Sequence, residues 1–250
     1  MALKSLIKKI LPVRVTAGIG TFLVSRRERR LGRLPISAAF DEVYKRGMWR
    51  QGASLSGVGS EGLMAERYID LVREYAAQHN LRTVLDGGCG DFSVGSQLAP
   101  NFTRYTAVDV SPHIIEINRQ RFVDQRWAHV TFAVANMTRT AFPEADLVLI
   151  RQVLQHLTNA QIEMILNGLE RGIWRRALIS ESVHNPENNQ LPNLDLPSHS
   201  VRTRTSLGSG VFIDRPPFSR LAKRIATIYS SVDGARQSGG LLVLELSRDA

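Results

Sequence analysis

The residues with the clearest chemical potential lie in a glycine-rich run that follows a short apolar stretch. The run reads Val84-Leu-Asp86-Gly-Gly88-Cys-Gly90-Asp-Phe92. Glycines after a strand let the backbone pass close beneath a bound nucleotide-like ligand. Open α/β sheets bind their ligands at this carboxyl edge of the strands. The run therefore predicts a turn that cradles a nucleotide-like cofactor.

A second acidic residue follows in the next apolar run, Tyr105-Thr-Ala-Val-Asp109-Val110-Ser-Pro112. If this run is a strand, Asp109 lies at its end, near the same edge of the sheet as the glycines. A carboxylate at that position can accept hydrogen bonds from both hydroxyl groups of a ribose. The two runs together indicate a nucleoside-binding site.

Two common phosphate-binding motifs do not fit the glycine-rich run. A dinucleotide fingerprint, Gly-x-Gly-x-x-Gly, would need a glycine where Ser93 stands. Asp86 also precedes the glycines, where an NAD site usually has no acid. A P-loop would need Gly-Lys-Ser/Thr after the glycines, and none follows.

The runs around these residues alternate between strand-like and helix-like patterns. Strand-like runs lie at 83–86, 105–110, 130–134, 146–150 and 176–180, with helix-like runs after Ser93 and at 112–122 and 159–171. This order predicts an α/β fold with a doubly wound, mostly parallel, Rossmann-like sheet of seven strands. Runs 226–231 and 240–246 predict a terminal hairpin that adds an antiparallel strand. Helix-like stretches precede the sheet, at about 37–45 and 61–79.

Together the motifs resemble those of class I S-adenosylmethionine-dependent methyltransferases, of the bacterial type that modifies glycans or small molecules. The resemblance covers residues 82–182, and some members of that type share the order Gly-Cys-Gly-Asp-aromatic. It implies S-adenosylmethionine as the cofactor. It also implies a set of cofactor-binding residues, namely Asp86, Gly88, Cys89, Gly90, Asp109, Val110, Asn136, Met137 and Arg151.

The resemblance assigns a role to most of this set. Gly88 and Gly90 would line the methionine and the ribose, and Asp109 would hold the ribose. Asn136 and Met137 would frame the adenine, and the Asn136 amide oxygen would accept a bond from its amino group. Asp86 would orient the glycine turn, and the single cysteine, Cys89, is expected to pack beneath it.

The acceptor side offers one candidate base. Methyl transfer is an in-line displacement, and a hydroxyl acceptor benefits from a base within hydrogen-bond reach. His156 follows the fourth strand and is the predicted catalytic residue, although a histidine there can also cap or pack. Glu181 and His184 follow the fifth strand as alternatives.

Other sequence features restrict the class of molecule that could accept the methyl group. Methyltransferases that act on amino groups of nucleic-acid bases carry Asn/Asp-Pro-Pro-aromatic after the fourth strand, where this chain has 151–154, Arg-Gln-Val-Leu. DNA is therefore not an expected partner. Arg202 and Arg204 are candidates for a phosphate or carboxylate on a substrate. No cluster of His, Asp and Glu has metal-ligand spacing, so no metal is predicted.

The charge is concentrated at the N-terminus. The chain has 32 Lys and Arg against 23 Asp and Glu, and residues 1–35 contain nine basic groups and one acid. Within residues 2–11, aliphatic side chains recur at helical spacing opposite three lysines. This pattern favours binding to an anionic membrane surface. The alternatives are docking on the protein itself, an organellar transit peptide and RNA binding. No run is long and apolar enough to predict a membrane span.

These features predict a basic amphipathic arm at 1–35 and a methyltransferase domain at 36–250. The domain comprises a helical cap or lid at 36–80, a cofactor-binding core at 81–182, a substrate-side insertion at 183–224 and a terminal hairpin at 225–250.

The predicted function is methyl transfer from S-adenosylmethionine to an oxygen of a saccharide or related small molecule. The arm would hold the cytoplasmic enzyme at the inner membrane face. Two alternatives stay open. One is a catalytically silent cofactor-binding interaction subunit, and the other is a soluble small-molecule or RNA methyltransferase. The oligomeric state is not predicted.

Overall fold

The structure is a computed structural model that describes residues 26–50, 52–184, 190–229 and 239–248. The amphipathic helix predicted for residues 2–11 lies outside the described residues. In the part of the chain that is described, no helix has both the length and the apolar character needed to cross a membrane.

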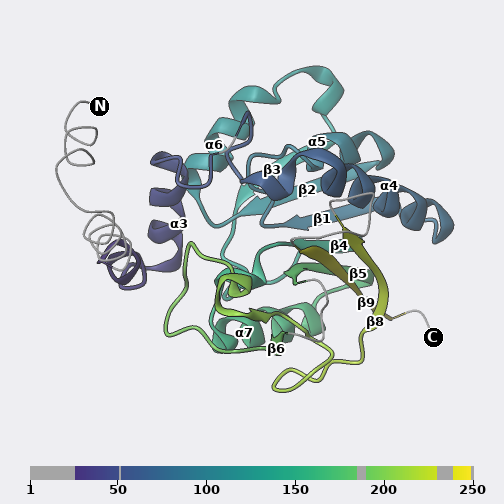
Figure 1. Ribbon diagram of the computed structural model, residues 1–250. Helices are drawn as coiled ribbons and strands as arrows, with labels where there is room; N and C mark the ends of the chain where they lie inside the picture. The colour runs from purple at the N-terminus through teal and green to yellow at the C-terminus, as the bar shows by residue number, and fades with distance from the viewer. Residues whose placement is uncertain (1–25, 51, 185–189, 230–238, 249–250) are drawn as a thin grey trace.

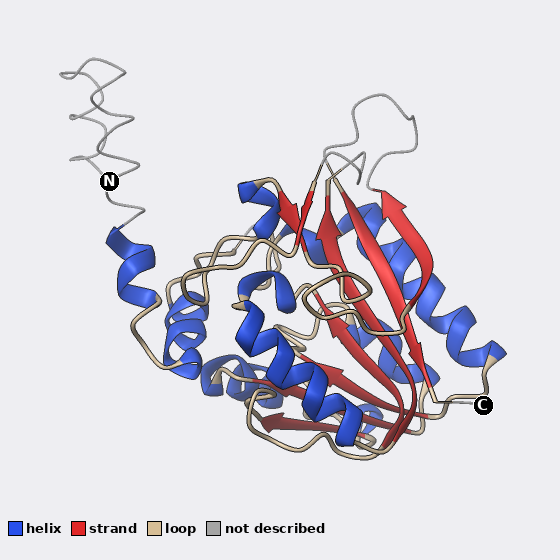
Figure 2. Cartoon of the chain, turned by 90° about the horizontal axis from the view of Figure 1, so that it is seen from below, coloured by secondary structure: helices blue, strands red, loops and turns tan. Residues whose placement is uncertain are grey.

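A seven-stranded sheet forms the centre of the molecule (Figures 1 and 2). Its strand order is β3-β2-β1-β4-β5-β9-β8. The strands are β1 (Thr83–Gly87), β2 (Arg104–Asp109), β3 (Val130–Val134), β4 (Ala145–Arg151), β5 (Trp174–Val183), β8 (Lys223–Tyr229) and β9 (Gly240–Ser247). Strands β1 to β5 pair in parallel, and β9 is antiparallel to both β5 and β8. The predicted mostly parallel sheet with a terminal antiparallel strand is confirmed.

The chain order reverses beside β1, and this reversal positions the site. From β1 the chain passes outward to β2 and β3, and it then returns to β4 on the other side of β1. Such a switch point opens a crevice at the carboxyl ends of the strands. Gly87 pairs with Val108 in β2 and with Ile150 in β4, so the glycine-rich turn emerges between the ends of both neighbours.

Helices cover both faces of the sheet (Figure 2). They are α3 (Ile36–Lys45), α4 (Gly62–Gln78), α5 (Gly95–Leu98), α6 (Pro112–Arg121) and α7 (Asn159–Arg171). Helix α6 begins with Pro112 after a Ser111 cap, and α7 begins with a capping box formed by Thr158 and Gln161. The helix predicted after Ser93 is a single turn, α5, followed by a 3₁₀ turn that contains Pro100.

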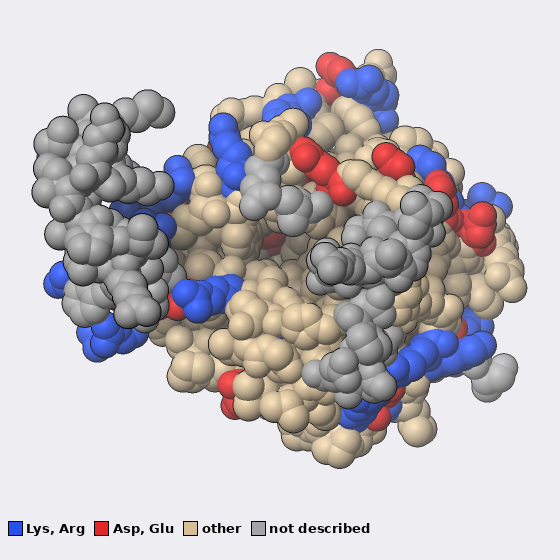
Figure 3. All heavy atoms as spheres, viewed as in Figure 1, with Lys and Arg blue, Asp and Glu red and all other residues tan. Residues whose placement is uncertain are grey.

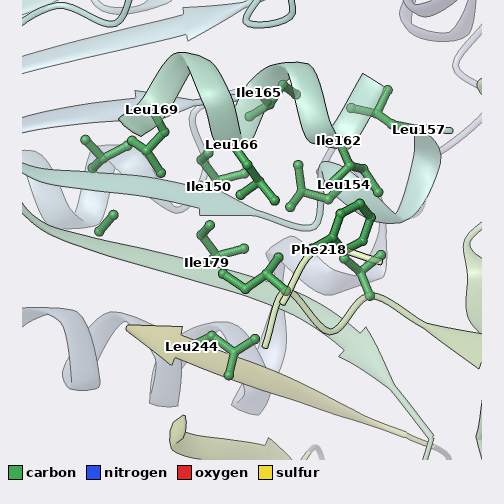
Figure 4. Packing of buried hydrophobic residues seen from close by; sticks show 14 of the residues in the cluster. Ile150, Leu154, Leu157, Ile162, Ile165, Leu166, Leu169, Ile179, Phe218 and Leu244 are labelled. Atoms are coloured by element: carbon green, nitrogen blue, oxygen red, sulfur yellow. The ribbon is translucent and has the colours of Figure 1, made fainter. Parts of the chain in front are cut away.

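Two hydrophobic clusters lie on opposite faces of the sheet, and β4 contributes alternate residues to each. Val148 and Ile150 face α7, whereas Leu147 and Leu149 face α4 and α6. Figure 4 shows the first cluster, in which side chains of α7 pack over Ile150. This packing fixes the end of β4, where the site begins.

Of the predicted insertion at 183–224, the structure describes residues 183–184 and 190–224. The part between the strands, residues 190–222, is well packed. It contains a two-stranded sheet of β6 (Leu191–Pro192) and β7 (Ser209–Gly210). Buried polar side chains hold it in place. Asn193 bonds the backbone of Phe212 through both ends of its amide, and the fully buried Arg204 donates to the carbonyl oxygens of Leu157 and Leu194.

The last residues of the predicted arm contact this insertion. Residues 26–31 are helical, and Leu31 is buried in the first cluster. Glu28 pairs with Arg202, and His199 bonds the carbonyl oxygen of Leu31. Figure 3 shows Lys and Arg side chains on the surface at the end of the molecule where the described chain begins.

Candidate cofactor and acceptor site

A cavity of about 770 Å³ opens at the switch point of the sheet. Every residue that the sequence assigned to the cofactor lines it: Asp86, Gly88, Cys89, Gly90, Asp109, Val110, Asn136, Met137 and Arg151. The predicted base, His156, lines it too. The topology thus brings residues from β1, β2, β4 and the loop after β3 to one place. The volume is typical of a small-molecule or cofactor site.

The glycine turn is built so that only glycine fits at two positions. Gly88 and Gly90 have φ angles of +81° and +56°. A Cβ atom on Gly88 would lie 2.3 Å from a methyl carbon of Val153, and one on Gly90 would lie 2.3 Å from Ser56 Oγ. These contacts leave a narrow cradle in which the backbone itself faces the cavity.

Phe92 stands where many members of the resembled family have a third glycine. Its φ angle is +62° and its ring is fully buried. The ring lies between 4.9 and 5.5 Å from those of Tyr105, Phe122 and Phe132. Phe92 therefore anchors the end of the turn in the second hydrophobic cluster and leaves the cradle itself unchanged.

Asp109 lies at the end of β2, as its position in the sequence predicts. Its carboxylate accepts hydrogen bonds from the backbone N–H groups of Gly90 and Ser111, at 3.1 and 2.9 Å. Burial raises its pKa to about 6, although these N–H groups act in the opposite direction. A desolvated carboxylate beside a cavity gains from further donors, such as the two hydroxyl groups of a ribose.

Asp86 is a second buried carboxylate beneath the turn. Burial raises its pKa to about 6, while a hydrogen bond from the Tyr105 hydroxyl group, 3.0 Å long, and the charge of Arg151 lower it. The Arg151 guanidinium lies over the ring of Tyr68, 5.0 Å from its centroid, and donates to the Gly59 carbonyl oxygen. Its Nε atom is buried and has no partner among the described residues. It can donate to an acceptor group of a ligand.

The Asn136 amide oxygen is not placed as expected for a bond from an adenine amino group. Its amide oxygen accepts from the N–H and the hydroxyl group of Thr138, at 3.0 and 2.8 Å. That oxygen is therefore engaged within its own turn and is not free for an adenine amino group. Met137 lies over Gly87, where an added Cβ atom would be 2.5 Å from its sulfur.

Asp91 ties the segment 54–56 to the glycine turn, a role that the sequence did not assign to it. Its carboxylate accepts from the Ser54 hydroxyl group and from the Leu55 N–H, and its own N–H donates to the Ser56 hydroxyl group. Burial raises the Asp91 pKa, but the bonds from Ser93, Leu55 and Ser54 outweigh it, so the pKa is lowered. The segment therefore covers one side of the cavity as part of the predicted cap.

His156 is a neutral histidine packed among aromatic rings. Its Nδ1 lies 3.1 and 3.2 Å from the carbonyl oxygens of Ser200 and Arg202, so Nδ1 carries the proton and Nε2 is an acceptor. Burial lowers its pKa to about 4, although the two carbonyls raise it. Its ring centroid is 4.9 Å from that of Trp49.

The other basic and acidic candidates have structural partners. Glu181 does not line the cavity. Its carboxylate oxygens accept hydrogen bonds from the N–H groups of Val153, Leu154 and Gln155. Burial raises the pKa of Glu181 to about 7. His184 lines the cavity and bonds the Thr205 carbonyl oxygen.

The prediction that Arg204 meets a substrate anion is wrong, because this side chain is fully buried and holds backbone carbonyls. Arg202 is paired with Glu28 at 2.5 Å. Within the described ranges, no group of three or more His, Cys, Asp or Glu residues is arranged to hold a metal ion.

Comparison with known proteins identifies one domain. Residues 84–173 match the family described as a methyltransferase domain. Nodulation protein S of Bradyrhizobium diazoefficiens is 30% identical over 100 residues, 40% of this chain and 46% of that protein. Nodulation protein S of Rhizobium tropici is 28% identical over 108 residues, 42% and 44% of the two proteins. The matches thus span less than half the length of these curated relatives.

Solved structures show the same fold. N-methyltransferase NodS from Bradyrhizobium japonicum WM9, in complex with S-adenosyl-L-homocysteine, has a TM-score of 0.60 at 16% identity and covers 83% of this chain and 99% of that one. Glycopeptide N-methyltransferase MtfA, complexed with sinefungin, has a TM-score of 0.52 at 15% identity, covering 72% and 93%. At these identities the likeness establishes the class I methyltransferase fold.

Proposed function

We propose, from the premise that this chain carries a methyltransferase domain of the class I fold, that it transfers a methyl group from S-adenosylmethionine to a saccharide or related small molecule. One observation carries the proposal. The Asp109 carboxylate at the end of β2 and the Gly88 to Gly90 cradle at the end of β1 line the same cavity. A nucleoside can bind its ribose to the first while it lies against the second.

The described residues fit this cofactor. S-adenosylmethionine supplies a methyl group on a positively charged sulfonium, which makes it a good electrophile. Asp109 would accept the ribose hydroxyl bonds that its desolvated carboxylate lacks. The Arg151 Nε atom, which has no partner among the described residues, would donate to the carboxylate of the methionine part. Asp86 lies in the lining and provides negative charge near a cationic ligand.

The acceptor atom depends on whether the site holds a base. The sequence predicts an oxygen, and a hydroxyl group needs a partner that takes its proton. His156 is the predicted base, but a pKa of about 4 makes it a weak one. A neutral amine is nucleophilic enough to attack the sulfonium methyl group before it loses a proton, and the ammonium product releases that proton to water afterwards, whereas a neutral hydroxyl group is a poor nucleophile. This difference, and the N-methyltransferases among the similar structures, support an amine nitrogen as the acceptor, with a hydroxyl oxygen as the second candidate.

Mass spectrometry after incubation with S-adenosylmethionine and either glucosamine or glucose separates the two candidates. We expect methylation of glucosamine at its amine. Transfer to glucose and to the hydroxyl groups of glucosamine would show that the acceptor is an oxygen.

Calorimetric titration with S-adenosylhomocysteine tests the cofactor site itself. We expect saturable binding by the full chain and a loss of at least about tenfold in affinity for Asp109→Ala, because its ribose bonds are charge-assisted. Asp124→Ala is the matched control, since Asp124 is exposed and does not line the cavity. Circular dichroism verifies that each variant is folded. No binding to the folded wild-type chain would favour the silent interaction subunit.

The N-terminal arm supports a location at an anionic membrane surface, such as the cytoplasmic face of the inner membrane. Co-sedimentation with vesicles of phosphatidylglycerol tests this, using the full chain and a chain that lacks residues 1–25. This truncation leaves the docked Leu31 in place. We expect only the full chain to sediment, and the triple change of Lys4, Lys8 and Lys9 to Glu to abolish it. Equal sedimentation of both chains would contradict the membrane role.

A further inference from the structure

The cavity extends beyond the cofactor residues into a region bounded by α3, the loop 198–205 and the turn after β4. Phe40, Trp49, His156 and Val201 line this region, which we call the acceptor region. None of these residues belongs to the glycine turn or to the end of β2. The acceptor region is therefore the part of the cavity that is available to a second molecule.

Gln155, a polar side chain of this region, lacks good hydrogen-bond partners. It is only 4% exposed, and its Oε1 atom is buried with no partner in the described part of the chain. Its Nε2 atom makes only long contacts, 3.4 Å to the Gln152 carbonyl oxygen and 3.5 Å to His156 Nε2. A buried amide oxygen without a donor is costly, so its presence beside a cavity points to a donor on a ligand.

A second acceptor atom lies beside Gln155. Because the carbonyl oxygens of Ser200 and Arg202 fix the proton of His156 on Nδ1, Nε2 is an acceptor. Its contact with the Gln155 Nε2 atom is 3.5 Å long, so a closer donor on a ligand can replace it. Glu181 holds the backbone of this turn by accepting the Gln155 N–H, so both side chains start from a fixed position. The pair can receive two hydrogen bonds from one polar group or from neighbouring groups.

The apolar wall of the acceptor region is an aromatic surface. Trp49 is held by a 3.0 Å bond from its indole N–H to the Val201 carbonyl oxygen, and its ring packs against Phe40 and His156. A fixed aromatic face beside hydrogen-bond acceptors suits a ring with an apolar face and polar edges.

The charge of the lining is unfavourable for anions. Four acids line the cavity, Glu61, Asp86, Asp91 and Asp109, and Arg151 is the one Lys or Arg in the lining that the structure describes. Arg204, which could have balanced these acids, is buried against the backbone of the insertion and does not line the cavity. Since Arg151 is already proposed to hold the carboxylate of the cofactor, a phosphate or carboxylate on the acceptor would have no cationic partner in the described lining.

We propose that Gln155 Oε1 and His156 Nε2 position the methyl acceptor, a saccharide-like ring without anionic groups, which lies against Trp49 and donates N–H or O–H bonds to both atoms. Gln155 is thus a positioning and specificity residue. This inference rests on the proposed methyltransferase function.

Tryptophan fluorescence of the full chain, saturated with S-adenosylhomocysteine, tests the proposal. The probes are glucosamine, glucose and glucosamine 6-phosphate, and Trp49→Phe identifies the signal that belongs to Trp49. We expect glucosamine or glucose to change the Trp49 emission and the phosphorylated sugar to bind at least about tenfold more weakly. Gln155→Leu should weaken sugar binding about tenfold, because it removes the acceptor atom.

Gln155→Glu separates positioning from a merely structural role. It keeps an acceptor oxygen, so we expect it to bind glucosamine within about threefold of wild type. Gln125→Leu, at an exposed position outside the cavity, should leave sugar binding unchanged. Equal losses for Gln155→Leu and Gln155→Glu, or binding of glucosamine 6-phosphate as tight as that of glucosamine, would overturn the proposal.

The failure of the underlying function gives a different result. If S-adenosylhomocysteine does not bind, the methyltransferase proposal fails together with this inference. If it binds with wild-type affinity to every Gln155 variant while no sugar changes the Trp49 emission, only the acceptor region has been assigned incorrectly.

Discussion

Asp109 is a buried carboxylate whose negative charge is needed to bind the cofactor, although burial disfavours that charge. Its carboxylate receives N–H groups from Gly90 and Ser111, yet burial still raises its pKa to about 6. The ionised form is the one that accepts ribose hydroxyl bonds, and a cationic ligand stabilises it further. Cofactor binding should therefore depend on pH in a range where most carboxyl groups do not titrate.

We expect the affinity for S-adenosylhomocysteine to fall about tenfold between pH 8 and pH 5. A group with a pKa of about 6 is mostly ionised at the first pH and about one-tenth ionised at the second. Calorimetry at both values, on the wild type and on Asp109→Asn, measures the effect. The Asp109→Asn variant should lose most of the pH dependence of the affinity. If its affinity changes with pH as much as that of the wild type, another group, such as Asp86, is the one that titrates.

Asp91 is a second single residue on which the site depends, because it anchors the segment 54–56 of the predicted cap. Asp91→Ala removes the partner of the Ser54 hydroxyl and Leu55 N–H groups, both at the buried end of the segment 54–56. We expect a loss of about 2–4 kcal/mol in the free energy of unfolding, measured with urea. Asp70→Ala is the control, because Asp70 is exposed and its contact with Arg73 is a surface ion pair. Equal stability of the two variants would contradict the anchoring role.

At the scale of elements, the insertion 190–222 depends on a buried cation. Arg204 bonds Leu157, Leu194 and Asn159, which connects the insertion to the turn after β4 and to the start of α7. We expect Arg204→Ala to lower the free energy of unfolding by about 3–5 kcal/mol, since it leaves buried carbonyl oxygens without donors. Arg126→Ala, at an exposed position, should change it by less than about 0.5 kcal/mol. Urea unfolding compares the two, and similar midpoints would show that the insertion is held by its apolar contacts.

The features that could be predicted from the sequence are those that depend on local patterns or on where a strand ends. Alternating strands and helices identified the sheet, and Asp109 could be placed because a residue at the end of a parallel strand must lie at the ligand-binding edge. Arg204 and Glu181 were misassigned because their partners are backbone atoms of segments far away in the sequence. Gln155 gave no signal, since its importance depends on an unpaired buried atom that only the assembled cavity reveals.

At the scale of the whole molecule, the N-terminal segment and the acceptor region share one loop. Glu28 and Leu31 contact Arg202 and His199 on one side of this loop. On its other side, the Ser200 carbonyl oxygen fixes the tautomer of His156. Whatever the arm binds can therefore change the order of the loop that forms the acceptor region.

Hydrogen exchange at the amide of Ser200, which donates to the His156 carbonyl oxygen at 2.8 Å, measures this connection. Truncation of residues 1–34 removes Leu31 and Glu28 and should speed exchange at this amide about tenfold, because local opening then breaks fewer contacts. Truncation of residues 1–25 keeps both contacts and should leave the rate unchanged. The amide of Leu85 in β1 serves as the internal reference, since it lies in the centre of the sheet. If both truncations leave Ser200 protected, the arm and the acceptor region are independent, and the proposed membrane binding would not act on the acceptor region.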